Sequence, residues 1–96
     1  MLRNPEAVST YRRKAVGGNV DALQMLARSY ANGILVDRNP IRAYAYYLAS
    51  ERAARSVIPP SLADTVRAKY AAGLSASEMK SADQLGREIY QDCCAP

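Results

Sequence analysis

Apolar residues along this chain recur every three or four positions, which is the spacing of one face of an α-helix. The clearest case is residues 20–32, where the apolar side consists of Ala22, Leu23, Leu26, Ala27 and Tyr30. No segment alternates polar and apolar residues for long enough to predict a strand. The pattern therefore predicts an all-α protein.

The same spacing predicts four more helices, at about residues 5–16, 40–56, 61–73 and 76–92. The first carries Val8, Tyr11 and Ala15 on one face. The apolar positions of the two longest are Ile41, Ala43, Tyr44, Tyr47 and Leu48, and Met79, Ala82, Leu85, Gly86 and Ile89. These residues are the predicted core faces of a protein with about five helices.

Start and stop residues support these boundaries. Gly33 is expected to end the helix at 20–32 in a left-handed conformation, and Val36 to pack the following loop onto the core. Asn39-Pro40 combines a helix cap with the residue preferred at the first helical position. Ser61–Asp64 and Ser75–Glu78 have capping-box spacing, with the usual Glu only in the second.

An internal repeat says more than any one helix. "LARSYANG" at residues 26–33 returns 40 residues later as "VRAKYAAG" at 66–73, and Ala7 and Tyr11 return 36 residues later as Ala43 and Tyr47. Such a period is typical of antiparallel helix pairs that stack on one another. We expect one domain over residues 1–96, folded as a short right-handed α-solenoid. Its predicted parts are the tail of a preceding repeat (5–16), a complete repeat (19–56), and a degraded repeat with a capping helix (60–92).

The stretch "GNVDALQMLARSYANGILVDRNPIRAYAYYLAS" resembles the Sel-one-like repeat, a relative of the tetratricopeptide repeat. The resemblance rests on Gly18, Ala22, Leu26, Tyr30, Gly33, Val36, Asn39, Ala43, Tyr46 and Tyr47, in register without a gap. The chain departs from the family pattern at Leu35, where a second loop Gly is usual, and at Ala27, where a Gly is common. The resemblance implies a bacterial or eukaryotic adaptor that assembles signalling, envelope or secretion complexes.

Composition narrows the function further. The 96 residues carry 13 Lys and Arg against 9 Asp and Glu, a net charge of +4 that mildly favours acidic partners. No apolar run approaches a membrane span, and the first residues lack the apolar core of a secretory signal. We therefore expect a cytoplasmic protein from the chain as written, or a periplasmic or secreted one if it is a trimmed mature form.

Candidate chemistry is sparse. The chain has no His, the commonest general base and metal ligand, and we expect no enzyme activity, cofactor or metal. Ser77 and Lys80 match the Ser-x-x-Lys pattern of penicillin-recognising enzymes, but no Lys-Thr-Gly segment accompanies them. A β-lactam-binding protein using these two residues is the weakest alternative. Adjacent Cys93 and Cys94 form no zinc pattern and leave their role open.

A second alternative is a nucleic-acid-binding module. Arg12, Arg13 and Lys14, with Arg3 nearby, are the densest basic cluster, and binding through them would weaken steeply with salt. No recognition motif accompanies the cluster, so a solvated face or a protein-docking patch is the favoured interpretation.

The favoured function is protein–protein interaction on a concave face lined by the first helix of each pair. An acidic peptide or helix is the expected partner, and a second copy of the chain is another. Exposed Tyr and Arg residues are enriched at such interfaces, so one of the tyrosines near Arg42 is a candidate anchor. The predicted contacts are Gln24, Arg28, Ser29, Tyr44, Tyr46, Arg67 and Lys69.

Overall fold

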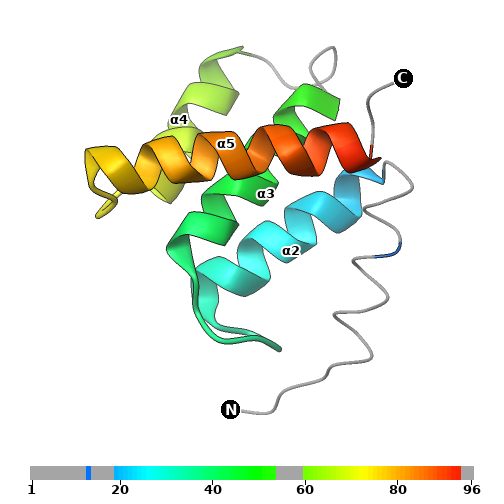
Figure 1. Ribbon diagram of the computed structural model, residues 1–96, viewed down its shortest axis with the longest axis horizontal. Helices are drawn as coiled ribbons and strands as arrows, with labels where there is room; N and C mark the ends of the chain where they lie inside the picture. Colours follow the sequence, from blue (N-terminus) through cyan, green and yellow to red (C-terminus); the bar gives the residue numbers. More distant parts are fainter. Residues whose placement is uncertain (1–12, 14–18, 54–59, 94–96) are drawn as a thin grey trace.

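The structure, a computed structural model, describes residue 13, residues 19–53 and residues 60–93. These contain α2 (Val20–Asn32), α3 (Pro40–Ala53), α4 (Pro60–Ala71) and α5 (Ala76–Cys93), as Figure 1 shows. The described ranges contain no strand, which confirms the all-α class. Apart from Arg13, the helix predicted at residues 5–16 lies outside the described residues, so the five-helix count stays a prediction.

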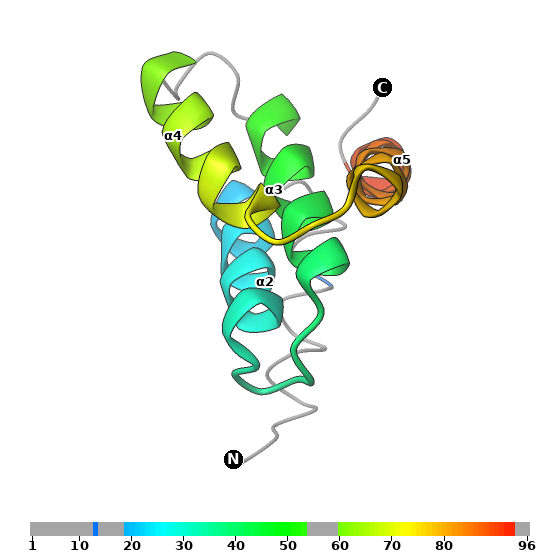
Figure 2. The ribbon, with the colours of Figure 1, turned by 90° about the vertical axis from the view of Figure 1, so that its left-hand side faces the viewer.

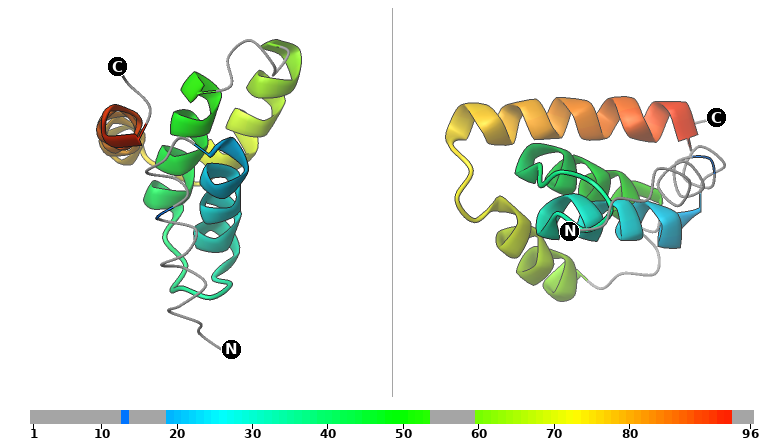
Figure 3. Two further views of the ribbon diagram at one scale, coloured as in Figure 1. Left: turned by 90° about the vertical axis from the view of Figure 1, so that its right-hand side faces the viewer. Right: turned by 90° about the horizontal axis from the view of Figure 1, so that it is seen from below.

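Helix α3 is the centre of the arrangement. It packs against α2, α4 and α5, with α2 and α4 on one side and α5 on the other (Figures 2 and 3). The chain reverses direction between α2 and α3 and again between α3 and α4, so α2 and α4 run the same way. The two helices that share the repeated sequence therefore lie on the same side of α3.

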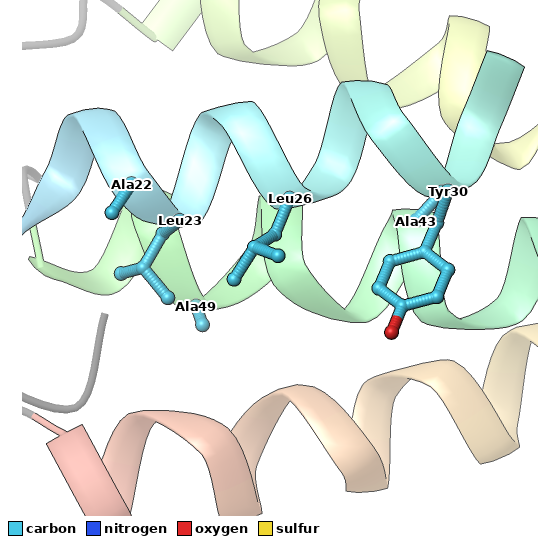
Figure 4. Packing of buried hydrophobic residues seen from close by; sticks show 6 residues of the cluster. All are labelled: Ala22, Leu23, Leu26, Tyr30, Ala43 and Ala49. Carbon is cyan, nitrogen blue, oxygen red and sulfur yellow. The ribbon is translucent and has the colours of Figure 1, made fainter. Parts of the chain in front are cut away.

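Small side chains allow the helices to approach closely. Leu23 and Leu26 are fully buried between α2 and α3, and Tyr30 closes one end of this cluster (Figure 4). On α3 the buried positions include three alanines, Ala43, Ala45 and Ala49. The predicted apolar side of α2 is thus confirmed, and the partner helix supplies mainly methyl groups against it.

The crossing of α5 over α3 depends on Gly86. A Cβ atom at this position would lie 3.0 Å from the carbonyl oxygen of Ala45 and 3.2 Å from the Cβ of Leu48. Ala82 is also fully buried, whereas Met79, predicted to share this face, is 38% exposed. The prediction for Met79 is wrong because the close contact centres further along α5, leaving its first turn uncovered.

The turn between α2 and α3 is formed by the residues that the sequence predicts for it. Gly33 adopts φ 67°, and its N–H donates to the carbonyl of Ser29. Asn39 then caps α3, because its Oδ1 accepts from the N–H of Arg42 at 3.1 Å. Val36 packs partly buried against the core, as predicted. Leu35 also has a left-handed φ, of 72°.

The two predicted capping boxes differ in outcome. Ser75 and Glu78 form theirs: the Ser75 N–H donates to Glu78 at 2.9 Å, and the Glu78 N–H donates to Ser75 Oγ at 3.2 Å. Hydrogen bonds from Ser75 to the Glu78 carboxylate, first from its backbone N–H and then from its side chain, lower the pKa of Glu78. Ser61 is not an N-cap, because α4 begins at Pro60 and Ser61 is its second residue. Proline is favoured at that first position and decided the boundary.

None of the helices in the described ranges combines the length and the apolar character that crossing a membrane requires.

Candidate functional site

A pocket of about 420 Å³ lies between α2, the start of α3 and α4. Its lining consists mainly of small apolar side chains and cations. The residues are Arg28, Ala31, Asn32, Arg38, Pro40, Ala43, Val66, Lys69, Tyr70 and Ala72. This is the space that remains between α2 and α4 on the side of α3 that they share.

Three cations surround the pocket, and they come from three segments of the chain. Arg28 belongs to α2, Arg38 to the loop before α3, and Lys69 to α4, and all three are exposed. The residues that line the pocket include no acid. Among the described residues, the ion pairs involve Arg67 and Arg87 and none of these three cations. The pocket therefore carries uncompensated positive charge.

The floor is apolar and well fixed. Ala43 is 1% exposed and lies in the core, while Tyr70 is half-buried and stacks on Tyr47 with ring centroids 5.0 Å apart. Burial raises the pKa of Tyr70, and the nearby Arg28 guanidinium partly opposes this rise. Tyr70 is thus a neutral wall residue at ordinary pH, close enough to Arg28 to feel its charge.

Arg38 is held in place by the end of α2. Its Nε donates to the carbonyl of Ala31 at 3.3 Å, which satisfies one of the carbonyls that the helix end leaves open. This bond leaves the terminal guanidinium nitrogens available beside the pocket. The loop itself is fixed by a bond from the Asn39 N–H to the carbonyl of Tyr30 at 2.9 Å.

Behind the pocket, Arg67 joins α4 to α3. Its Nη2 lies 2.6 Å from Glu51 Oε1 and its Nε donates to Glu51 Oε2 at 3.2 Å, a two-point contact with a carboxylate that is 16% exposed. A further contact of 3.3 Å reaches Asp64. The bonds to Glu51 raise the pKa of Arg67. A bidentate pair of this kind fixes orientation as well as distance, so Arg67 holds the α4 wall in position.

The structure brings only two of the seven predicted contact residues into this pocket, Arg28 and Lys69. The guanidinium of Arg67 is engaged by Glu51 and Asp64. Ser29 and Tyr44 are 4% and 6% exposed, so neither offers a surface to a partner in this structure. Side chains one or two positions apart on a helix point in different directions, so residues close to an exposed cation can face the core.

Gln24 and Tyr46, the other two, lie outside the pocket and are half-buried. Gln24 is one turn before Arg28 on α2, so it extends the same helix face. Tyr46 stacks on Tyr30 at 5.7 Å, and Arg42 lies 5.7 Å above the Tyr30 ring. The expected tyrosine–arginine anchor is therefore an internal contact of the α2–α3 pair.

Sequence reasoning missed Arg38, Tyr70 and Asn32. Arg38 lies in a loop, where no helical period assigns a face, and its position depends on the turn made by Gly33. Tyr70 stacks on Tyr47 and also lines the pocket, and nothing in the sequence distinguishes this double role. The repeat itself was the available signal, because the first helix of each pair was expected to line the binding face.

The structure adds no supporting arrangement of side chains for the alternative sites. Ser77 and Lys80 are exposed on the first turns of α5, and Ser77 Oγ lies 3.2 Å from Ser75 Oγ. Of the basic cluster, only Arg13 is among the described residues, and it is exposed. The side chains of Cys93 and Cys94 lie outside them. The described part of the chain contains no group of three His, Cys, Asp or Glu residues placed to hold a metal ion.

Comparison with protein-family models finds no match to the chain, and comparison with curated proteins finds none either.

Proposed function

We propose that this protein is a non-enzymatic interaction module that holds an acidic segment of a partner protein in the pocket between α2 and α4. The observation that carries the proposal is the charge of this pocket: Arg28, Arg38 and Lys69 converge from three segments, and the lining contains no acid. Cations that no internal acid neutralises attract an anionic partner and speed its association.

The internal repeat supports an adaptor of stacked helix pairs. Tyr30 on α2 and Tyr70 on α4 occupy equivalent repeat positions, and each stacks on a tyrosine of α3. Gly33 and Gly73 both have positive φ at the helix ends. These matches, together with the resemblance to the Sel-one-like repeat, favour a short α-solenoid whose first helices line the binding face.

The test uses two degenerate peptide libraries with a fluorescent label. Half of the positions in one are Asp or Glu, and the same positions in the other are Asn or Gln. We expect the acidic library to bind, measured by fluorescence anisotropy, and the neutral library not to bind. Lys69→Glu should weaken binding by about tenfold, because it both removes an attraction and adds a repulsion.

Lys80→Glu is the matched control. Lys80 is also exposed and the substitution changes the net charge equally, but α5 lies on the opposite side of α3 from the pocket. We expect Lys80→Glu to change the affinity by less than about twofold. Equal binding of both libraries, or equal losses in the two variants, would contradict the proposal, because either result would mean that the pocket does not recognise the acids.

A further inference from the structure

Resting on this proposed function, we infer that the pocket recognises one apolar anchor residue flanked by acids within the partner segment. The argument comes from where the two kinds of lining residue lie. Ala43 is 1% exposed and lies at the bottom of the pocket, whereas Arg28, Arg38 and Lys69 are all exposed. The pocket therefore has an apolar floor and a basic rim.

A ligand must match both parts to bind well. A purely acidic segment would satisfy the rim but leave the methyl groups of the floor in contact with water or with a desolvated carboxylate, which is costly. A purely apolar segment would fill the floor and leave the cations without partners. A central apolar side chain with acids on both sides satisfies floor and rim together.

The size of the pocket limits the number of anchors. A volume of about 420 Å³ is at the small end of the range, roughly 300–1,000 Å³, that ligand pockets occupy. A single Leu, Met or Phe side chain with its adjoining backbone suits such a volume. An amphipathic helix that inserts three or four anchors would need a longer groove.

The positions of the three cations determine where the acids of the bound segment should lie. Arg28 and Lys69 belong to α2 and α4, which lie on the same side of α3 and run the same way (Figure 2). Arg38 lies at the end of α2, beside its last residues. A segment whose anchor enters between α2 and α4 therefore passes basic side chains before and after the anchor.

A second copy of the chain does not supply this pattern. In the part of the chain that the structure describes, the large apolar side chains with substantial exposure are Met25, Ile34 and Met79. None of them has an acid as its immediate neighbour on both sides. Glu78 precedes Met79 but Lys80 follows it, and neither Met25 nor Ile34 has an adjacent acid. The occupant we infer is consequently a segment of another protein.

The experiment uses labelled peptides of glutamates that differ only at one central position, which is Leu, Ala or Ser. By fluorescence anisotropy we expect the Leu peptide to bind about tenfold more tightly than the Ala and Ser peptides. In Val66→Thr, which keeps the shape of the apolar lining but adds a hydroxyl group, the preference for Leu should fall to less than about threefold. Val20→Thr, at the start of α2, is the matched control and should keep the full preference.

Each outcome separates this inference from the proposed function. If the three peptides bind equally and Lys69→Glu weakens all of them, the apolar anchor is wrong and the acidic recognition stands. If no peptide binds at any usable concentration, both are wrong. If the Leu preference persists unchanged in Val66→Thr, the anchor does not enter this pocket and the inference is overturned.

Discussion

Two segments of this molecule share a sequence pattern and differ in what they do. Residues 26–33 on α2 and residues 66–73 on α4 each end at a glycine with positive φ, 67° at Gly33 and 85° at Gly73. Each also stacks a tyrosine on α3. Yet α2 lies in the core, with Leu26 fully buried, while Val66 at the equivalent position of α4 is only half-buried.

The cause of this difference lies between the shared positions. Ala27 and Ser29 of α2 are small and buried, whereas their equivalents on α4 are Arg67 and Lys69. Burying either cation without a partner would be costly, so Arg67 pairs with Glu51 and Lys69 remains in solvent. The repeat therefore supplies the position of a helix, and its variable residues decide how deeply that helix is buried in the core.

The prediction with the largest expected effect tests the difference in burial between α2 and α4 directly. Leu26→Ala should lower the free energy of unfolding by about 2–5 kcal/mol, because it leaves a cavity in the fully buried cluster. Val66→Ala should cost about 1 kcal/mol, because it removes two methyl groups that are already partly exposed. Urea denaturation followed by circular dichroism measures both. Equal losses would mean that α4 is as much a part of the core as α2.

The second prediction concerns the tyrosine stack on the α4 side. Burial, and then the nearby Glu51 that accepts a hydrogen bond from Tyr47, raise the pKa of Tyr47 from 10.0 to about 12. Above pH 10 the unfolded chain loses this proton while the folded chain keeps it, so the folded state is stabilised below pH 10 and loses that contribution as the pH rises to about 12. The loss should be about 2–3 kcal/mol.

Tyr47→Phe has no phenol to titrate at this position and should remove the contribution of Tyr47 from the alkaline decline, measured by urea denaturation at a series of alkaline pH values. Tyr44 and Tyr70, whose pKa values burial also raises, leave a residual decline. Tyr46→Phe, in the stack on the α2 side, is the control and should keep the decline. A steep decline that persists in Tyr47→Phe would assign the alkaline sensitivity to another group.

The smallest expected effect compares the two glycine stops. Alanine at either Gly33 or Gly73 would be forced into a left-handed conformation, at a cost of about 1–2 kcal/mol each. Gly33→Ala should be the more costly of the two, because its Cβ would lie 3.4 Å from the Arg38 Cβ, whereas nothing lies within 4 Å of a Cβ at Gly73. Thermal unfolding of both variants tests the order. The reverse order would show that the contact with Arg38 does not determine the difference between the two turns.

Much of the fold could be predicted from local rules. The helix at residues 20–32 was expected with the bounds that the structure has, because a regular apolar stripe, Asn32-Gly33 and the next Asn-Pro start all agree. The Ser75–Glu78 capping box formed for the same reason: both partners lie within one turn. Where two local signals competed, as at Pro60 and Ser61, the sequence alone did not show which would win.

The candidate site was harder to predict than the fold, and the sequence pointed to only some of its residues. Arg28 and Lys69 were predicted as contacts because the first helix of each pair was expected to line a concave face. Ser29 and Tyr44 were chosen from the same neighbourhoods, but a difference of one residue turns a helical side chain by about 100°, which moved both into the core. Arg38 could not be found, because a loop residue takes its direction from the turn around it.

By itself, the sequence determined the helical class, both ends of α2, the starts of α3 and α5, the repeated tyrosine and glycine positions, and the excess of positive charge. These depend on interactions between residues within a few positions of each other, which a single chain segment carries with it. Only the tertiary structure decided that α3 lies at the centre and that Glu51 neutralises Arg67. It also decided that Arg28, Arg38 and Lys69 meet around one apolar floor. Charges distant in the sequence become a site only when packing determines which of them find an internal partner and which remain available to another molecule.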